Sequence, residues 1–338
     1  MLHDRKNEHL DVVLSGKGTS RARTGFDDIT FEHVALPELH MDEIDLSTDF
    51  LGKRINAPLL VSSMTGGPAR AEDINRNIAI ACQELGIALA VGSQRIAIEA
   101  RENAGLGAEL RRLAPDIPLL GNFGAAQLNL GFGVDQARRA IEMIGADALI
   151  IHLNPLQEAV QPEGDRDWRG LLNKIETLAR TLGAPIVVKE VGAGISGPLA
   201  RRLREAGVAV IDVAGAGGTS WAAVEAARAR TPEQAAIARA FVDWGIPTAT
   251  AIKSVREHCP DAVIIGSGGI RDGIDVAKAI RLGANVVGQA AGILKAATES
   301  PDGVIASLRL TIAQLRVACF CTQSANLAAL GRARLIDL

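Results

Sequence analysis

Eight short apolar runs, separated by segments of helical periodicity, constrain the fold of this chain more than any other feature. Each run is aliphatic on both faces, as strands buried in a parallel sheet are, and is soon followed by glycine or a polar residue. The runs occupy residues 57–62, 88–91, 118–121, 148–151, 185–188, 208–211, 262–265 and 285–287. Strict alternation of eight such strands with helices favours a (β/α)8 TIM barrel over an open sheet.

Several intervening segments end in or beside glycine, the residue that most easily adopts the left-handed conformation at a helix C-terminus. Helices are expected at residues 135–144, 168–182, 198–206, 272–282 and 304–330. A weak internal repeat relates Gly145-Ala146-Asp147-Ala148 to Gly283-Ala284-Asn285-Val286, each closing a helix and opening a strand.

Two segments fall outside the repeat of strands and helices. Residues 1–56 form an N-terminal extension before the first strand, and residues 215–247 form a long loop insertion after strand six, with room for an extra helix. The length of 338 residues suits one barrel with such additions. We therefore expect a single domain over residues 1–338.

Charge and composition exclude several classes of partner. The 36 Lys and Arg residues nearly balance the 39 Asp and Glu residues, for a net charge of −3, so no overall basic field exists to attract nucleic acid or an anionic membrane. The sequence predicts neither a transmembrane span nor a secretory signal, and its four cysteines lack the spacing of disulfides or zinc ligands. We expect a cytoplasmic protein with structural thiols.

Residues that follow the strands are the candidates for function, because barrels of this kind build their active sites from those loops. The first three runs lead into residues 62–67, 92–95 and 121–124, which are rich in glycine and in small hydrogen-bonding side chains. Such residues let a flat ring approach the backbone closely, although any single glycine there also fits an ordinary turn.

The fourth run ends in a dense polar cluster of His152, Asn154, Gln157 and Glu158, and Pro155 stops the strand from continuing. A lone histidine at such a position is usually structural, whereas an imidazole, two amides and a carboxylate together indicate a binding site. Glu158 alone offers too few ligands for a metal cage. It suits Mg²⁺, which keeps several waters and is completed by substrate phosphates.

Lys189 ends the fifth run, where a buried ammonium needs an anion. A reduced flavin ring, a phosphate or a Schiff-base carbonyl would each serve, and an ion pair with Glu190 or another carboxylate is the structural alternative. Glycine-rich blocks follow the last three runs, at residues 214–219, 266–273 and 288–292. Their backbone amides suit a monophosphate, while Asp272 also fits a simple helix N-cap.

Together these motifs resemble the type 2, flavin-dependent isopentenyl diphosphate isomerases. The resemblance begins at Arg5-Lys6-x-x-His9-Leu10, which taken alone reads as a solvated tail, and continues in order through nearly the whole chain. Its most specific parts are the block from His152 to Glu158 and the block Asp243-Trp244-Gly245-Ile246-Pro247-Thr248. The glycine blocks discriminate little, because many flavin barrels share them.

The resemblance implies FMN and Mg²⁺ as cofactors, isopentenyl and dimethylallyl diphosphate as substrates, NADPH or another reductant for the flavin, and a homo-oligomer, either a tetramer or an octamer. It assigns the surroundings of FMN to Ser63, Met64, Thr65, Ser93, Asn122, Lys189, Thr219, Gly268, Gly269, Arg271, Ala290 and Ala291. It assigns the substrate to Arg5, Lys6, His9, Ser93, Gln94, Arg95, His152, Asn154 and Gln157 and the Mg²⁺ contact to Glu158, and residues 1–56 thereby contribute to substrate binding.

The isomerisation protonates an unactivated alkene at one carbon and removes a proton from another, so a carbocation-like species must be shielded from water. We expect reduced FMN to act as acid and base near its N5 atom. Catalytic roles are expected for Lys189, which would stabilise the reduced ring, for Gln157, which would position or relay a proton, and for His152.

Two alternatives use the same barrel. One is an FMN-dependent oxidoreductase of the 2-hydroxy-acid oxidase or nucleotide dehydrogenase type. Against it, no histidine followed by paired glycines and arginine stands near strand seven, and no cysteine stands in a predicted catalytic loop. The other is a non-catalytic flavin- or phosphate-binding protein, which would not require the polar cluster from His152 to Glu158.

Overall fold

The computed structural model describes residues 2–63, 69–100 and 106–336, although not the side chains of residues 2–5 and 69. Met64 and Thr65, both expected near FMN, lie outside the described residues.

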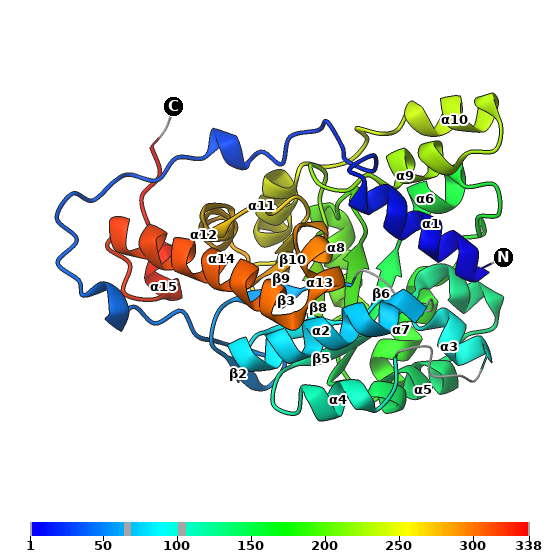
Figure 1. Cartoon of the computed structure of the whole chain (residues 1–338), viewed down its shortest axis with the longest axis horizontal. Coiled ribbons are helices and arrows are strands. Elements are labelled where there is room, and N and C mark those ends of the chain that lie inside the picture. Colours follow the sequence, from blue (N-terminus) through cyan, green and yellow to red (C-terminus); the bar gives the residue numbers. More distant parts are fainter. Residues whose placement is uncertain (1, 64–68, 101–105, 337–338) are drawn as a thin grey trace.

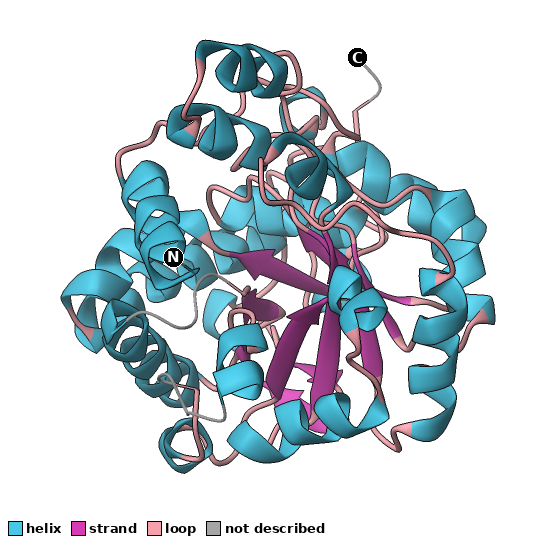
Figure 2. Cartoon of the chain, turned by 90° about the vertical axis from the view of Figure 1, so that its right-hand side faces the viewer, coloured by secondary structure: helices cyan, strands magenta, loops and turns pink. Residues whose placement is uncertain are grey.

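Eight parallel strands close into a barrel, in the order in which they occur along the chain, and the last pairs with the first. Figure 2 shows these strands at the centre of a ring of helices. The strands are β3 (Leu59–Val61), β4 (Ala88–Ala90), β5 (Leu119–Gly124), β6 (Ala148–Leu153), β7 (Ile186–Glu190), β8 (Val210–Asp212), β9 (Val263–Ser267) and β10 (Val286–Gln289). The (β/α)8 barrel predicted from the eight apolar runs is therefore confirmed.

The helices predicted at residues 135–144, 168–182, 198–206 and 272–282 are present within three residues of their expected bounds, whereas the one predicted at residues 304–330 is divided into two by a break at residues 322–326. Helices cover the outside of the barrel. They are α2 (Ala69–Leu85), α3 (Arg95–Ala100), α4 (Glu109–Leu113), α5 (Val134–Ile144), α6 (Pro155–Val160), α7 (Leu171–Thr181), α8 (Gly197–Glu205), α11 (Thr248–His258), α12 (Gly273–Arg281), α13 (Ala291–Glu299), α14 (Pro301–Cys321) and α15 (Leu327–Leu330). The insertion after β8 holds two helices rather than one, α9 (Trp221–Arg228) and α10 (Pro232–Arg239). Ser220 and Thr231 cap these two helices with side-chain hydrogen bonds.

The inward-facing side chains change from apolar to polar along the barrel axis. Inward positions on the strands form a buried apolar cluster that includes Leu60, Leu120, Ile150, Val187, Val210 and Ile265. Because side chains alternate along a strand, the next inward positions lie two residues further on. These positions carry Ser62, Asn122, His152, Lys189, Asp212 and Ser267. A polar layer therefore lies on top of the apolar interior, at the C-terminal ends of the strands.

The opposite end of the barrel is closed by an antiparallel hairpin of β1 (Thr48–Phe50) and β2 (Lys53–Ile55). Its buried side chains, Phe50 and Ile55, belong to the apolar cluster inside the barrel. The sequence patterns did not predict this hairpin.

The N-terminal extension runs from one end of the barrel to the other (Figure 1). It begins with a helix, α1 (Leu2–Leu14), which lies against α9 and α13 at the C-terminal end. The following segment pairs Thr19 with Thr219, Phe31 with Leu335 and Asp45 with Asn326 before it reaches the hairpin. The solvated tail expected when this segment is considered alone is therefore a helix packed on the barrel.

Among the described residues, α14 is the one helix whose length and mean hydropathy of 1.6 would allow it to cross a membrane. Such a result is weak evidence, because core helices of soluble proteins pass the same test. The helix packs against α2, α12 and α13 through a buried stripe that includes Val304, Leu308 and Leu315.

Candidate active site

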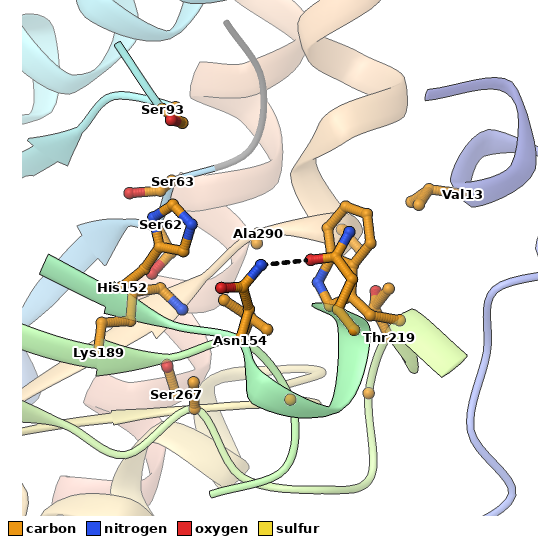
Figure 3. Close-up of a pocket in the computed structure, with 18 of the residues that line it drawn as sticks. Val13, Ser62, Ser63, Ser93, His152, Asn154, Lys189, Thr219, Ser267 and Ala290 are labelled. Carbon is orange, nitrogen blue, oxygen red and sulfur yellow. Dashed lines mark hydrogen bonds between the residues drawn. The ribbon is translucent and has the colours of Figure 1, made fainter. Parts of the chain in front are cut away.

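A cavity of about 300 Å³ lies at the C-terminal end of the barrel, within the size range of small-molecule sites. Its floor is the polar layer at the strand ends, and its walls are the loops after the strands together with α1 and α9. Figure 3 shows His152, Lys189, Ser62 and Ser267 gathered at the strand ends, with Thr219 and Val13 on the far side.

A chain of hydrogen bonds fixes the His152 ring. The side-chain amide of Asn122 donates to Ser63 Oγ at 2.8 Å, so Asn122 Oδ1 lies 2.8 Å from His152 Nδ1 and accepts its proton. Burial, together with the positive charges of Lys189 and Lys6, lowers the pKa of His152 to about 3. The imidazole is therefore neutral near pH 7, and the lone pair of Nε2 is left as a hydrogen-bond acceptor.

Lys189 places an ammonium group in the cavity floor, with the residue only 7% exposed. Its Nζ atom donates to the backbone carbonyl of Glu190 at 2.6 Å. The Glu190 carboxylate points instead into the following loop, where its Oε2 accepts from the backbone N–H groups of Val191 and Gly192 at 2.6 and 2.7 Å. The Glu190 carboxylate thus holds the loop, and the ion pair between Lys189 and Glu190 considered as a structural alternative is not formed.

Asn154 and Gln157 form a second network on the wall of the cavity. The Asn154 side-chain amide donates to Gln157 Oε1 at 3.1 Å and to Glu158 Oε1 at 2.9 Å. Gln157 Nε2 in turn donates to Glu225 Oε1, 3.2 Å away on α9. Both polar atoms of the Gln157 amide are therefore held in a fixed orientation.

Glu158 has an ordered carboxylate that lines the cavity. Its Oε2 accepts from Gln161 Nε2 and from the backbone N–H of Asp165, both at 2.7 Å. Among the residues that the structure describes, no group of three or more His, Cys, Asp or Glu residues is arranged to hold a metal ion. A single oriented carboxylate fits Mg²⁺ only where water and phosphate oxygens complete the coordination.

Helix α1 brings Lys6 and His9 to the cavity and is tied to α9 by charged groups. His9 Nε2 lies 3.0 Å from Glu225 Oε1, and Arg228 contacts both Glu8 and Glu225 at 2.8 and 2.7 Å. Glu225 is only 3% exposed, yet its pKa is lowered by the contacts with His9, Arg228 and Gln157, which outweigh the effect of burial. Lys6 Nζ reaches the backbone carbonyl of Ser93 at 3.3 Å.

Two glycine-rich loops meet backbone to backbone beside the cavity. A Cβ atom at Gly268 would lie 2.2 Å from the Gly215 carbonyl oxygen, and one at Gly218 would lie 2.6 Å from the Gly269 nitrogen. Gly268 also has a φ of +110°, which disfavours any side chain. The loops therefore require glycine, and glycines of both loops line the cavity.

These features fit a flavin phosphate. Ser62 Oγ and Gln289 Oε1 are buried polar atoms in the lining that have no hydrogen-bond partner among the described residues. A heterocyclic ring with donors and acceptors on its edge would satisfy such atoms, the Lys189 ammonium would offset negative charge on the ring, and the glycine loops suit its phosphate.

Most residues predicted for the site line this one cavity. They are Lys6, His9, Ser63, Ser93, Arg95, Asn122, His152, Asn154, Gln157, Glu158, Lys189, Thr219, Gly268, Gly269, Ala290 and Ala291. Arg5 lies on α1, but its side chain is outside the described part of the structure.

Two predicted residues lie outside the cavity. Gln94, expected to bind substrate, is fully buried behind the strands, where its side chain donates to the Ala140 carbonyl and accepts from the Asn122 backbone. Arg271, expected beside FMN, forms ion pairs with Asp27 and Asp275 instead, each at 2.7 Å. Long-range partners therefore direct both side chains away from the site.

Sequence reasoning missed Trp221, Glu225 and Arg228, which α9 brings to α1. The Trp221 ring lies edge-on to His9, with centroids 5.1 Å apart. Trp221 ends the block Gly217-Gly218-Thr219-Ser220-Trp221, which belongs to the family resemblance but gave Trp221 no role in the site. The only local signal of the other two was a glutamate and an arginine three residues apart in an alanine-rich helix. The partners are more than two hundred residues away, so no short-range pattern could have identified them.

The fold and the cavity define a class of flavin-binding barrel, and comparison with known proteins agrees. The sequence profile of the FMN-dependent dehydrogenase family matches residues 11–105 and 136–337. A mutant flavocytochrome b2 superimposes with a TM-score of 0.70 over 97% of this chain and 82% of its own, at 17% identity. A lactate oxidase of Pediococcus acidilactici gives 0.67 over 96% and 86%, at 16% identity. At such low identity these structures support the fold alone.

Curated relatives are far more similar in sequence. The protein named isopentenyl-diphosphate delta-isomerase in Stutzerimonas stutzeri is 63% identical over 100% of this chain and 98% of its own length. Proteins of that name in Cronobacter sakazakii and Synechocystis are 59% and 49% identical, over 99% and 98% of this chain and 96% and 95% of their own. The chain belongs to this family of FMN-dependent enzymes, the isopentenyl-diphosphate delta-isomerases.

Proposed function

We propose that the protein interconverts isopentenyl and dimethylallyl diphosphate by adding a proton at one carbon and removing a proton from another, with no net redox change. The observation that carries this proposal is the network of Asn154, Gln157, Glu158 and Glu225 on one wall of the cavity. Binding of FMN alone would not require it. The names of the curated relatives support the same reaction.

FMN, when bound in its reduced form, supplies an acid–base group at the N5 position of its ring. The Lys189 ammonium would stabilise negative charge on the ring from the cavity floor. The amides of the two glycine-rich loops would hold the phosphate, and Thr219, Ala290 and Ala291 would contribute to the same cofactor site.

Gln157 is the residue proposed to position a proton. Its Oε1 is held by Asn154 and its Nε2 by Glu225, at 3.1 and 3.2 Å. A fixed amide points its hydrogen-bonding atoms in defined directions without carrying a charge that would trap a carbocation-like species. Neutral His152 contributes an uncharged imidazole to the same cavity.

The substrate diphosphate is proposed to bind near α1. Lys6 and Arg95 bring positive charge to the lining, and Arg5 precedes Lys6 on the same helix. Leu10 and Val13 are the apolar lining residues of α1 and help to exclude water from the alkene. Glu158 would hold Mg²⁺, which would offset the negative charge of the diphosphate.

The remaining proposals concern the cellular setting. We propose NADPH or an equivalent donor as the reductant that keeps the flavin reduced, a cytoplasmic location, and a homo-oligomer of four or eight subunits. The near-neutral net charge of −3 suits small-molecule chemistry without nucleic acid or membrane partners.

The proposed function is tested by anaerobic incubation of the purified protein with reduced FMN, Mg²⁺ and isopentenyl diphosphate in D₂O. Products are followed by NMR and the flavin by its absorbance. Dimethylallyl diphosphate that carries deuterium, formed while the flavin stays reduced, is the expected result. Absence of product despite bound FMN would contradict the proposal, and reduction of oxidised flavin by 2-hydroxy acids would favour an oxidoreductase instead.

A further inference from the structure

Asp212 is a fully buried carboxyl group that has no role in the proposed reaction. It ends β8 and is 0% exposed. In the barrel it lies in register with Lys189 on β7. Adjacent strands are about 4.8 Å apart, and paired residues face the same side of the sheet. Asp212 therefore faces the barrel interior beside Lys189, in the polar layer at the strand ends, although it does not itself line the cavity.

The hydrogen bonding of Asp212 is incomplete. The Ser267 hydroxyl, from the neighbouring strand β9, donates to Asp212 Oδ1 at 2.5 Å. Asp212 Oδ2 is buried and has no hydrogen-bond partner within the described part of the chain. An unsatisfied buried carboxyl oxygen destabilises a fold, so its presence needs an explanation other than stability.

Lys189 is the charged residue next to Asp212 in the polar layer. An ammonium has three donors, and in the described residues Lys189 Nζ has one hydrogen-bond acceptor, the Glu190 carbonyl. The pKa of Asp212 is raised by its burial, which outweighs the opposing effects of the Lys189 charge and of the hydrogen bond from Ser267. The carboxyl group and the ammonium therefore influence each other across the β7–β8 pair.

We propose that Asp212 is a positioning residue for Lys189: as a buried counter-ion it weakens the attraction of the Lys189 ammonium for negative charge on a flavin ring bound above. It thereby sets how readily that ring is reduced. A neighbouring negative charge at this range opposes the field of a cation strongly where water is excluded. The inference rests on the proposed binding of FMN but not on the isomerase reaction.

The experiment compares the midpoint potential of bound FMN in four holoproteins by anaerobic titration against a reference dye. Asp212→Asn keeps the side-chain shape and removes the charge, and it should raise the equilibrium constant for reduction about tenfold, which is about 30 mV for a two-electron couple. Ser267→Ala removes the hydrogen bond that favours the ionised carboxyl and should shift the potential in the same direction by less. Asp147→Asn removes the same charge at the opposite end of the barrel and should leave the potential unchanged.

The outcomes separate this inference from the proposed function. An unchanged or lowered potential in Asp212→Asn would overturn the inference, as would an equal rise in Asp147→Asn. If Asp212→Asn does not fold, the direction of the shift in Ser267→Ala decides. If the unaltered protein does not isomerise the substrate but the potential shift in Asp212→Asn is observed, the proposed function alone is contradicted. Failure of the unaltered protein to bind FMN would overturn both the proposed function and this inference.

Discussion

The two ends of the barrel treat a carboxyl group in opposite ways. At the N-terminal end, Asp147 accepts from Lys53 Nζ at 3.0 Å, from Arg111 at 2.7 Å and from the Leu119 backbone at 2.8 Å, and these contacts lower its pKa. At the C-terminal end, Asp212 Oδ2 lacks a hydrogen-bond partner among the described residues. One end satisfies its carboxylate with three contacts, whereas the other leaves buried polar atoms unpaired, and two of these, Ser62 Oγ and Gln289 Oε1, line the cavity.

The internal repeat explains how the N-terminal end is held. Arg111 donates to the Gly145 carbonyl and to Asp147, and Arg256 makes the corresponding bonds to the Gly283 carbonyl and Asn285. Asp147 faces two cations, Arg111 and Lys53, and is charged, whereas Asn285 contacts one arginine and is neutral. The sequence repeat therefore corresponds to the same structural contact, an arginine bound to a glycine carbonyl and a nearby side chain, at two places in the barrel.

Substitutions at the two ends of the barrel should differ most in their effect on turnover. With reduced FMN, Gln157→Ala should lower the isomerisation rate about 10²- to 10⁴-fold, the range for loss of a group that handles a proton. Gln83, near the N-terminal end, is also held at both amide atoms, by Asp116. Gln83→Ala should cost about 1 kcal/mol of stability and leave turnover unchanged. Normal turnover in Gln157→Ala would rule out its catalytic role.

Glycine substitutions at the C-terminal end should affect the cofactor next most strongly. Gly268→Ala places a side chain on a left-handed backbone and against the Gly215 carbonyl, so FMN affinity should fall about 100-fold, or about 2.7 kcal/mol. Gly292 also lines the cavity but has no atom within 4 Å of an added Cβ. Gly292→Ala is therefore the control. Fluorescence titration of the two variant apoproteins with FMN measures their affinities, and equal affinities would show that the contact between the two loops does not shape the site.

At the N-terminal end the expected effect is on stability. Asp147→Ala leaves Lys53 and Arg111 without their carboxylate and should lower the free energy of unfolding by about 1–3 kcal/mol. The loss is smaller than for a fully buried ion pair, because these side chains are partly exposed to solvent. Urea denaturation of the apoprotein measures the loss. The rate of isomerisation at a temperature where the variant stays folded should equal that of the unaltered enzyme, and a large loss of rate would break the comparison.

The smallest expected effect is a pH dependence from His152. In the unfolded chain this ring takes up a proton near pH 6.5, whereas in the folded apoprotein its pKa is about 3. Its contribution to stability is therefore complete above pH 6.5 and is lost as the pH falls toward 3. Between pH 7 and 5.5 the unaltered protein should lose about 1 kcal/mol more than His152→Gln. Parallel curves for the two proteins would contradict the lowered pKa.

The strands and the cavity floor were predictable because their signals are local. Each strand is a short apolar run, and His152 and Lys189 stand directly at strand ends, where barrels place functional groups. The hairpin was not predictable, because each of its strands has three residues and only Phe50 and Ile55 are buried. Neither run shows an alternation long enough to stand out.

Contacts between distant segments explain the remaining differences. Helix α1 is rich in charged residues and is held by α9 through His9 and Glu8. Gln94 follows a strand, as many site residues do, but the position of α5 gives it a carbonyl to bond outside the cavity. Arg271 is drawn to Asp27 of the extension. A single sequence without its fold contains none of these pairings.

The contact between α1 and α9 also determines when the site is complete during synthesis. Residues 2–14 leave the ribosome first, but their partners Trp221, Glu225 and Arg228 follow about two hundred residues later. At about 5–20 residues per second, α1 waits on the order of ten seconds or longer for the surface it covers. The first helix made is therefore among the last to dock, and no N-terminal fragment that ends before α9 contains a closed cavity.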